Sequence, residues 1–288
     1  MADEIMRPKT LITDFDNTLY DWFHVWYQSF SAMIAEVVRI SGISEDVLFP
    51  EIREIHQKYR TSEYAFLLEE IPALRERYPA EDITHIFDDA IHAYRSARKH
   101  SLALYPGVEE TLIRLRQCGV QIVLYTESLA YYTNFRVKRL GLDPLIDYVY
   151  SPPDHELPVF FLPKASLNAG NGDAVLAFAE HRNLPPGVVK PDPEVLLDIV
   201  KDVGREPTEC IYLGDSLMKD IAMAQAALVT DVFAAYGGVQ HKEEYELLRK
   251  VSHWTDDDVE REKQVSRMAV SPNRSIECFA EIAEIIGE

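Results

Sequence analysis

The sequence predicts an α/β protein with a Rossmann-like, doubly wound parallel sheet as its core and an inserted α-helical domain. From residue 105 onward, short apolar runs alternate with helical patterns, as they do in successive β-α-β units. Residues 21–103, in contrast, show helical patterns only. A chain of 288 residues with 47% hydrophobic residues is long and apolar enough for one large domain with such an insert.

The first expected strand begins at Thr10 and stops at two carboxylates, Asp14 and Asp16. A β-branched run that ends in acids indicates a buried parallel strand whose carboxyl end opens onto a loop, where the ligands of such sheets bind. Because Phe15 lies between the two acids, they can share one site only if the chain already bends there. Asn17 suits that bend because it tolerates a left-handed backbone. Taken alone, the pair could equally be a cap and a turn.

The insert of residues 21–103 is expected to form a separate helical domain. Apolar residues recur at spacings of three and four along four segments, which are 22–40, 51–59, 61–69 and 80–99. The aromatic residues of these segments are expected in the core of that domain. Tyr20, Asp21 and Trp22 lie where the sheet core turns into the insert, so they are candidates for a hinge or for substrate contacts.

The remainder of the core alternates strands with helices. Further strands are expected over 120–125, 146–150, 210–213 and 229–233. Helices are expected over 106–118, 130–140, 194–203 and 219–226. Five strands with helical crossovers imply a doubly wound sheet, so residues 1–20 and 104–288 are assigned to the core.

Two segments of the core fall outside this alternation. Residues 151–189 are rich in Pro, Gly and Asn with one helix expected near 173–181, and a stretch of this length is typical of a flap near a site or a surface excursion. Residues 240–288 are expected to be a helical C-terminal extension, with helices over 242–250, 256–267 and 275–286.

Charge and cysteine content limit the possible functions. A net charge of −19 argues against binding a nucleic-acid polymer or an anionic membrane, because both require positive patches. The three cysteines are far apart, so they indicate neither a disulfide framework nor a zinc site. Without a long apolar run or a signal-peptide core, the chain is expected to be soluble and cytoplasmic. The sequence carries no indication of oligomeric state.

Polar side chains gather at or beside the ends of the expected strands. They are Asp14 with Asp16, Thr126, Lys190, and Asp215 with Asp220. Each has an ordinary structural explanation when taken alone, such as a helix cap, a solvated charge or a turn. Their order resembles motifs one to four of the haloacid dehalogenase (HAD) superfamily, on Asp-Phe-Asp-Asn-Thr-Leu, Thr126, Lys190-Pro-Asp-Pro and Gly214-Asp-Ser-Leu-Met-Lys-Asp. The resemblance covers residues 8–21 and 104–235, and the insert resembles the four-helix cap of the first subclass.

These residue types suit phosphoryl transfer. A carboxylate can attack a phosphoryl group and split hydrolysis into two displacements through an aspartyl-phosphate, and Asp14 is the candidate nucleophile. A second carboxylate, Asp16, can protonate the leaving oxygen and later activate water. The resemblance implies Mg²⁺ as the cofactor, held by Asp14, the backbone carbonyl of Asp16, and Asp215.

The resemblance also implies how a phosphate is bound. The implied substrate-binding residues are Asn17, Thr18, Thr126, Glu127 and Lys190. Lys190 and Thr126 are further expected to take part in catalysis, with Lys190 screening Asp14. Ser216 and Asp220 are expected to support the site, and Asp220 would orient either Lys190 or a metal-bound water.

Asp16 favours phosphate ester hydrolysis, because the dehalogenases of the superfamily lack this second acid. The expected substrate is a small phosphorylated metabolite, such as a nucleotide, a sugar phosphate or phosphoglycolate. Three alternatives stay open: a phosphomutase, a phosphonatase, and a non-catalytic phosphate-binding protein. A phosphonatase would need a cap lysine able to form a Schiff base, for which the candidates are Lys58 and Lys99.

Overall fold

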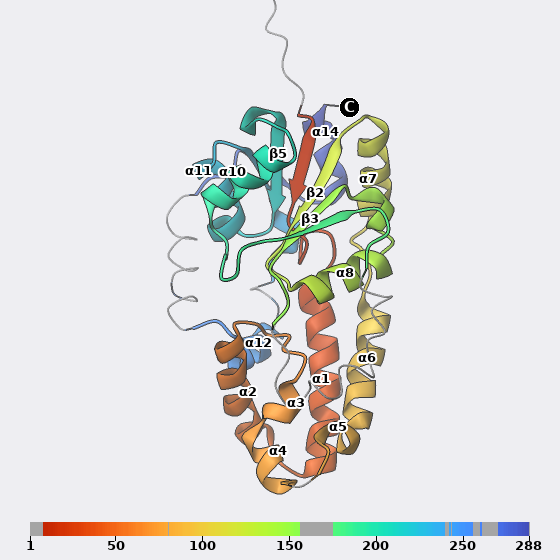
Figure 1. Ribbon diagram of the computed structural model, residues 1–288, viewed down its shortest axis with the longest axis vertical. Helices are drawn as coiled ribbons and strands as arrows, with labels where there is room; N and C mark the ends of the chain where they lie inside the picture. Colours follow the sequence, from red (N-terminus) through yellow and green to blue (C-terminus); the bar gives the residue numbers. More distant parts are fainter. Residues whose placement is uncertain are drawn as a thin grey trace, which may run out of the picture. The chain divides into compact units, whose positions relative to one another are not determined.

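The computed structural model describes residues 8–79, 81–155, 175–239, 242, 244–255, 260 and 270–287. The contacts of the chain divide it into two compact units, both drawn in Figure 1. The core unit comprises Met1–Asp21, Ala103–Gly238 and Met268–Glu288. The helical unit comprises Trp22–Leu102 and Val239–Arg267.

The core unit is built on a seven-stranded parallel sheet with the strand order β4-β3-β2-β1-β5-β6-β7. The strands are β1 (Thr10–Thr13), β2 (Gln121–Tyr125), β3 (Tyr148–Ser151), β4 (Glu180–Asn183), β5 (Cys210–Gly214), β6 (Thr230–Ala234) and β7 (Arg274–Ile276). From β1 the chain moves outward through β2 to β4, and then returns to β5 on the other side of β1. The strand order therefore reverses beside β1, where doubly wound sheets bind their ligands. The predicted α/β class is confirmed.

Helices cover both faces of this sheet, with α10 and α11 on one face and α7 on the other (Figure 1). The helices among the described residues of the core unit are α7 (Val108–Gln117), α8 (Ala130–Arg139), α10 (Pro193–Asp202), α11 (Ala222–Ala226) and α14 (Ile282–Ile286). Short helical turns are formed by Asp143–Leu145, Pro207–Glu209, Ala235–Gly237 and Phe279–Glu281, and Leu217–Ile221 forms one π-helical turn. Leu196 and Ile199 of α10 share a buried apolar cluster with Ile12 of β1, so α10 covers the centre of the sheet.

The helical unit has its own apolar core. The helices in its described part are α1 (Trp22–Ser41), α2 (Glu45–Tyr59), α3 (Leu67–Glu70), α4 (Pro72–Arg77), α5 (Ile83–Ile86), α6 (Asp88–Ser101) and α12 (Tyr245–Val251). The rings of Trp26 and Phe30, one turn apart on α1, stack with their centroids 5.0 Å apart. They join Ile52 of α2 and Leu74 of α4 in one buried cluster, as the spacing of apolar residues predicts.

The helical unit also contains a segment from the far end of the chain, which corrects the expectation that all of 240–288 extends the core. Val239–Arg267 groups with the helical unit, and α12 packs there. Val251 is buried in the same cluster as α1 and α2, and its carbonyl oxygen lies 2.6 Å from Nδ1 of the His56 ring. Periodicity identified an apolar face on α12, but it could not identify which surface covers that face.

Two expected helices of the core unit are wrong. The described part of 173–181 consists of bends and the start of β4, because the Asp143 carboxylate accepts hydrogen bonds from three successive backbone N–H groups, those of residues 177–179. Residues 275–286 form β7, a helical turn and the short α14, and they bury Ile276, Phe279 and Ile282 without one continuous helix. Residues 156–174 of the expected flap and most of the expected helix at 256–267 lie outside the described residues.

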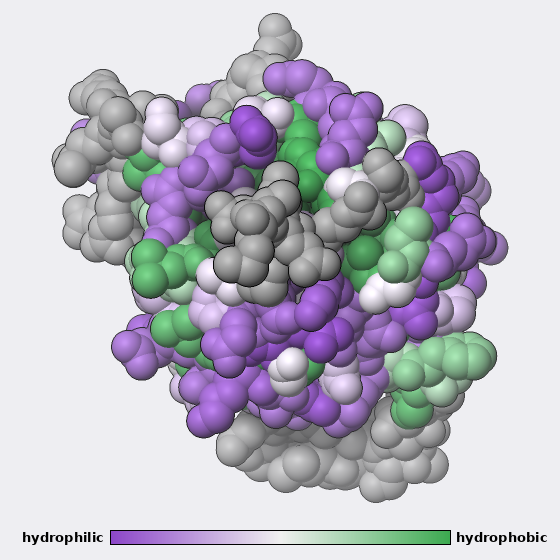
Figure 2. All heavy atoms as spheres, turned by 90° about the horizontal axis from the view of Figure 1, so that it is seen from above, coloured by the Kyte–Doolittle hydropathy of each residue, from purple (hydrophilic) through white to green (hydrophobic). Residues whose placement is uncertain are grey.

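One face of the molecule is mainly polar among the described residues (Figure 2). Figure 2 shows hydrophilic residues over most of one face, with hydrophobic residues in smaller separate areas. Among the described helices, none combines the length and apolar character needed to cross a membrane.

Candidate active site

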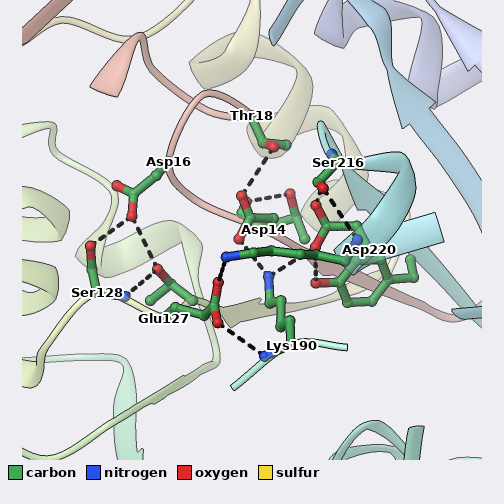
Figure 3. Close-up of polar contacts among 12 residues, drawn as sticks. Asp14, Asp16, Thr18, Glu127, Ser128, Lys190, Ser216 and Asp220 are labelled. Carbon is green, nitrogen blue, oxygen red and sulfur yellow. Dashed lines mark hydrogen bonds and ion pairs between the residues drawn. The ribbon is translucent and has the colours of Figure 1, made fainter. Parts of the chain in front are cut away.

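The candidate active site lies at the carboxyl ends of three neighbouring strands of the core unit (Figure 3). Asp14 follows β1, Thr126 follows β2, and Asp215 follows β5. Lys190 comes from the loop that precedes α10. Because parallel strands end at one edge of the sheet, residues far apart in the sequence meet there, as the order of the motifs predicts.

Asp14 and Lys190 form a buried ion pair. Lys190 Nζ lies 2.6 Å from Asp14 Oδ1 and 3.0 Å from Asp220 Oδ1. Thr18 Oγ1 donates a hydrogen bond to the other oxygen of Asp14 at 3.3 Å, and the Tyr212 hydroxyl donates one to Asp220 Oδ1 at 3.0 Å. One ammonium group is thus shared by two carboxylates in a site from which water is largely excluded, where such contacts are strong.

The carboxylates of this site repel one another. Burial raises the pKa of Asp14 to about 7, and the negative charges of Asp220 and Asp16 add to that rise, although Lys190 opposes it. Burial, together with Asp14 and Asp220, also raises the pKa of Asp215 well above its ordinary value. Burial alone would lower the pKa of Lys190, but Asp14 and Asp220 outweigh it and keep this pKa well above the ordinary value. The lysine is therefore charged, and the site holds more carboxyl groups than one lysine can neutralise if all of them ionise.

This excess of negative charge suits a divalent cation. Carboxylate oxygens of Asp14, Asp215 and Asp220 lie within 4.8 Å of one another. Oxygen ligands of this kind are those that Mg²⁺ prefers, and a cation would relieve the repulsion that raises their pKa values. The residues present therefore fit the expected metal.

Asp220 is less available to a cation than the other two acids. Its Oδ1 accepts hydrogen bonds from Lys190 and Tyr212, and its Oδ2 accepts one from the backbone N–H of Ser216 at 3.0 Å. Of the two roles expected for Asp220, the structure shows the contact with Lys190. Asp14 and Asp215 are consequently better placed as metal ligands.

The Asp16 carboxylate points away from this pair toward the loop after β2 (Figure 3). Its Oδ2 accepts hydrogen bonds from Ser128 Oγ at 2.6 Å and from Thr126 Oγ1 at 3.3 Å. Its Oδ1 accepts a hydrogen bond from the hydroxyl of Tyr20. The side chain of Asp16 keeps 22% of its surface exposed, whereas that of Asp14 keeps 10%. The two acids thus occupy different environments, which suits different chemical roles.

Glu127, expected to bind substrate, is held by contacts with two lysines of the site. Its Oε1 accepts a hydrogen bond from the backbone N–H of Lys190 at 3.0 Å, and its Oε2 accepts one from Lys219 Nζ at 2.5 Å. The Ser216 hydroxyl accepts a hydrogen bond from the backbone N–H of Lys219 and so caps the start of the π-helical turn that carries Asp220. Glu127 and Ser216 therefore both hold the segments that present the two lysines.

The loop after β1 is held by backbone contacts around Asn17, Thr18 and Gly237. Asn17 has φ 58°, the left-handed conformation that its position suggested. The Tyr236 hydroxyl donates to the carbonyl oxygen of Thr18 at 2.8 Å. A Cβ atom at Gly237 would lie 2.3 Å from the carbonyl oxygen of Asn17 and 2.6 Å from Asp215 Cβ, so only glycine fits here.

Several residues of the site were not identified from the sequence. They are Ser128, Arg136, Tyr212, Lys219 and Gly237. The sequence position of Arg136 could have identified it, because a charged residue is unusual on the helix face that buries Thr133 and Val137. Tyr212 carried none, since a tyrosine in an apolar strand is ordinary.

Fold and site together define an α/β enzyme with a carboxylate-centred active site. The family model for haloacid dehalogenase-like hydrolases matches residues 8–227, and the chain belongs to this family.

Curated relatives and solved structures agree with this assignment. The chain is 24% identical over 238 residues to a glyceraldehyde 3-phosphate phosphatase of Methanopyrus kandleri. The matched region covers 82% of this chain and 87% of the relative. It is 28% identical over 242 residues to a phosphoglycolate phosphatase of Pseudomonas syringae pv. syringae, and this match covers 80% of this chain and 70% of the relative. A 2-haloacid dehalogenase from Pseudomonas syringae pv. tomato shares the fold, with a TM-score of 0.56, 18% identity, and coverage of 97% and 98%. A HAD phosphatase from Thermococcus onnurineus does so with a TM-score of 0.53, 19% identity, and coverage of 97% and 98%.

Proposed function

We propose that this protein is a Mg²⁺-dependent phosphatase that hydrolyses a small phosphate monoester through an aspartyl-phosphate on Asp14. The observation that carries this proposal is the pairing of Asp14 with Lys190 beside a second acid, Asp16, in a separate environment. The two curated relatives named above are a glyceraldehyde 3-phosphate phosphatase and a phosphoglycolate phosphatase, which supports the same substrate class. Glyceraldehyde 3-phosphate and phosphoglycolate are therefore the first substrates to try.

In the first displacement, a carboxylate oxygen of Asp14 attacks phosphorus, and the bond from phosphorus to the leaving oxygen breaks. Asp16 donates a proton to that oxygen, so the alcohol leaves neutral. Lys190 keeps the negative phosphate close to the negative nucleophile by screening their repulsion. Thr126, whose hydroxyl already lies between the loops after β1 and β2, would donate to a phosphate oxygen.

In the second displacement, a water oxygen attacks phosphorus, and the bond between phosphorus and Asp14 breaks. Asp16, now ionised, takes a proton from that water, so inorganic phosphate leaves and both acids return to their starting states. Mg²⁺, held by Asp14, Asp215 and, by family resemblance, the backbone carbonyl of Asp16, would supply charge neutralisation at the phosphate oxygens.

The phosphonatase alternative gains no support from its lysine candidates. A lysine that forms a Schiff base needs a lowered pKa. Lys58 is exposed and forms a salt bridge with Glu70 at 2.8 Å, and the hydrogen bond to Glu70 raises its pKa. Lys99 is also exposed.

Turnover of phosphate monoesters tests the proposal. Phosphate release is measured from p-nitrophenyl phosphate, glyceraldehyde 3-phosphate, phosphoglycolate, sugar phosphates and nucleotides, with Mg²⁺ and with a chelator. We expect activity that requires Mg²⁺ and that Asp14→Asn abolishes, while Asp198→Asn, at an exposed acid of α10, keeps it. Undiminished turnover by Asp14→Asn would refute the proposal, and Mg²⁺ binding without turnover of any ester would favour a non-catalytic protein.

A further inference from the structure

Arg136 of α8 is completely buried, and its guanidinium group lies beside the Asp16 carboxylate. Its Nη1 is 3.2 Å from Ser128 Oγ, to which it donates a hydrogen bond, and 3.6 Å from Asp16 Oδ1. Its relative exposure is 0%, whereas arginine is almost never fully buried unless it is paired. Desolvating a guanidinium is costly, so a buried arginine next to an active-site acid calls for a functional explanation.

The surroundings of Arg136 fix the position of its guanidinium group. The guanidinium carbon lies 5.8 Å from the ring centroid of Tyr20 and 5.5 Å from that of Tyr132. Such ring contacts attract a cation and restrict where its planar group can lie. Arg136 is therefore a rigid support rather than a mobile surface charge.

Both oxygens of Asp16 meet donors that Arg136 also contacts. Ser128 Oγ, which receives a hydrogen bond from Arg136, donates its own proton to Asp16 Oδ2 at 2.6 Å. Tyr20, whose ring faces Arg136, donates its hydroxyl proton to Asp16 Oδ1. Arg136 thus contacts the Asp16 carboxylate directly, and it also contacts the two residues, Ser128 and Tyr20, that donate hydrogen bonds to that carboxylate.

We propose that Arg136 is a positioning residue that, with Tyr20 and Ser128, sets the direction of the Asp16 carboxylate for proton transfer to the leaving oxygen. This inference rests on the proposed phosphatase function. It predicts a dependence on the leaving group, because an alkoxide needs a proton in order to leave, whereas p-nitrophenolate is stable enough to leave without one. Loss of general packing would slow both substrates alike.

The test compares kcat/KM for p-nitrophenyl phosphate and for an alkyl monoester that the wild-type protein hydrolyses, since kcat/KM includes the step in which the leaving group departs. We expect Arg136→Met to lower kcat/KM about 10- to 100-fold for the alkyl ester and less than about threefold for the aryl ester. General acid catalysis contributes about 10²- to 10⁴-fold in rate, and a wrongly directed Asp16 carboxylate would lose part of that contribution. The matched control is Arg139→Met, which removes an exposed arginine from the same helix and should change neither value.

Two further variants keep the test decisive if Arg136→Met does not fold. Tyr20→Phe removes only the hydroxyl that binds Asp16 and keeps the ring, which packs edge-on against Phe15 with centroids 4.9 Å apart. Arg136→Lys keeps the charge but loses the planar group, so it should lower kcat/KM for the alkyl ester selectively, but by less than the loss expected of Arg136→Met. A selective loss of kcat/KM for the alkyl ester in Tyr20→Phe, with a smaller selective loss in Arg136→Lys, supports the proposal.

Asp16→Asn separates failure of this inference from failure of the proposed function. If Asp16→Asn lowers kcat/KM selectively for the alkyl ester but the Arg136 and Tyr20 variants lower it equally for both substrates, or for neither, the positioning role is overturned and the phosphatase proposal stands. If Asp16→Asn itself shows no selectivity, the acid role of Asp16 fails and the inference falls with it.

Discussion

Lys190 Nζ lies 2.6 Å from Asp14 Oδ1, and both side chains are almost completely buried. A buried carboxylate next to Asp16, Asp215 and Asp220 would otherwise tend to take up a proton, since burial and like charges favour its neutral form. The lysine therefore does more than bind an anion: it helps to keep a nucleophile ionised in a crowded acidic site. Replacement of this lysine is accordingly the first variant to make.

Lys190→Met should lower kcat at least about 100-fold, the size of effect seen when one charge-stabilising group is removed from an active site. The matched control is Lys219→Met, because Lys219 is also a lysine of the site, but it is only partly buried and pairs with Glu127. Its loss should reduce kcat less than about tenfold, as it only loosens the support of Glu127. Equal losses in the two variants would contradict a special role for the contact between Lys190 and Asp14.

Asp215→Asn should weaken Mg²⁺ binding, because it removes one of the two acids best placed as ligands. Binding is measured without turnover, as the rise in melting temperature on adding Mg²⁺ to the chelator-treated protein. At 100 times the dissociation constant, the wild-type protein should gain about 2.7 kcal/mol of stability. Asp198→Asn should keep that gain, and an unchanged gain in Asp215→Asn would remove this residue from the metal site.

Gly237→Ala should disable the site although the residue bears no functional group. Its new Cβ would meet the carbonyl oxygen of Asn17 and Asp215 Cβ, so the loop of Asp14 must move. A displacement of about 1 Å can cost about 100-fold in rate. Gly204→Ala is the control: its φ of +74° makes alanine cost about 1 kcal/mol, but nothing lies within 4 Å of the added atom, so activity per folded molecule should not change. Thermal melts followed by circular dichroism, together with kcat, separate loss of folding from loss of activity. Full activity in Gly237→Ala would contradict the close packing of Gly237 against Asn17 and Asp215.

The helical unit should lose stability in mild acid through His56. Burial lowers the pKa of this histidine from 6.5 to about 4, although the Val251 carbonyl and Glu63 oppose the shift. Between these values the unfolded chain binds a proton that the folded chain does not, so stability falls as the pH drops from about 6.5 to about 4. At 1.36 kcal/mol per pKa unit, the loss approaches about 3 kcal/mol.

Urea unfolding at a series of pH values measures this loss. Tryptophan fluorescence reports on the helical unit, since Trp22, Trp26 and Trp254 all belong to it. His56→Gln, which cannot titrate, should flatten the dependence on pH, whereas His100→Gln, at an exposed position of α6, should not. The same slope in His56→Gln and wild type would show that other groups cause the acid loss.

The sequence predicted the centre of the fold well because its signals there are local. A β-branched run that ends at Asp14, with Asn17 at the bend, needs no distant partner to be recognised. The edge strands β4 and β7 carry no such run, so they were missed. They depend on distant contacts: Asp143 holds the backbone that leads into β4, and Asp231 accepts a hydrogen bond from the backbone N–H of Asn273 at 2.8 Å just before β7.

In the site, too, the positions of residues along the chain were predictable, whereas the contacts of their side chains were not. The motifs located Asp14, Lys190 and Asp215, because the ends of parallel strands converge. They could not show that Glu127 turns toward the two lysines, nor that Arg136 comes from the next helix to stand beside Asp16. The direction of a side chain depends on its neighbours in space, which spacing along the chain does not reveal.

Trapping the covalent intermediate tests the central claim most directly. In Asp16→Asn, p-nitrophenyl phosphate can still phosphorylate Asp14 because its leaving group needs no proton, but the second displacement lacks its base, so the aspartyl-phosphate should accumulate. After an acid quench, borohydride reduces an acyl phosphate to the alcohol, and peptide mass spectrometry locates the change. The proposed mechanism predicts homoserine at position 14 in place of Asp14, and none in the Asp14→Asn, Asp16→Asn double variant. Turnover of p-nitrophenyl phosphate with Asp14 unmodified, or reduction at another residue, would contradict it.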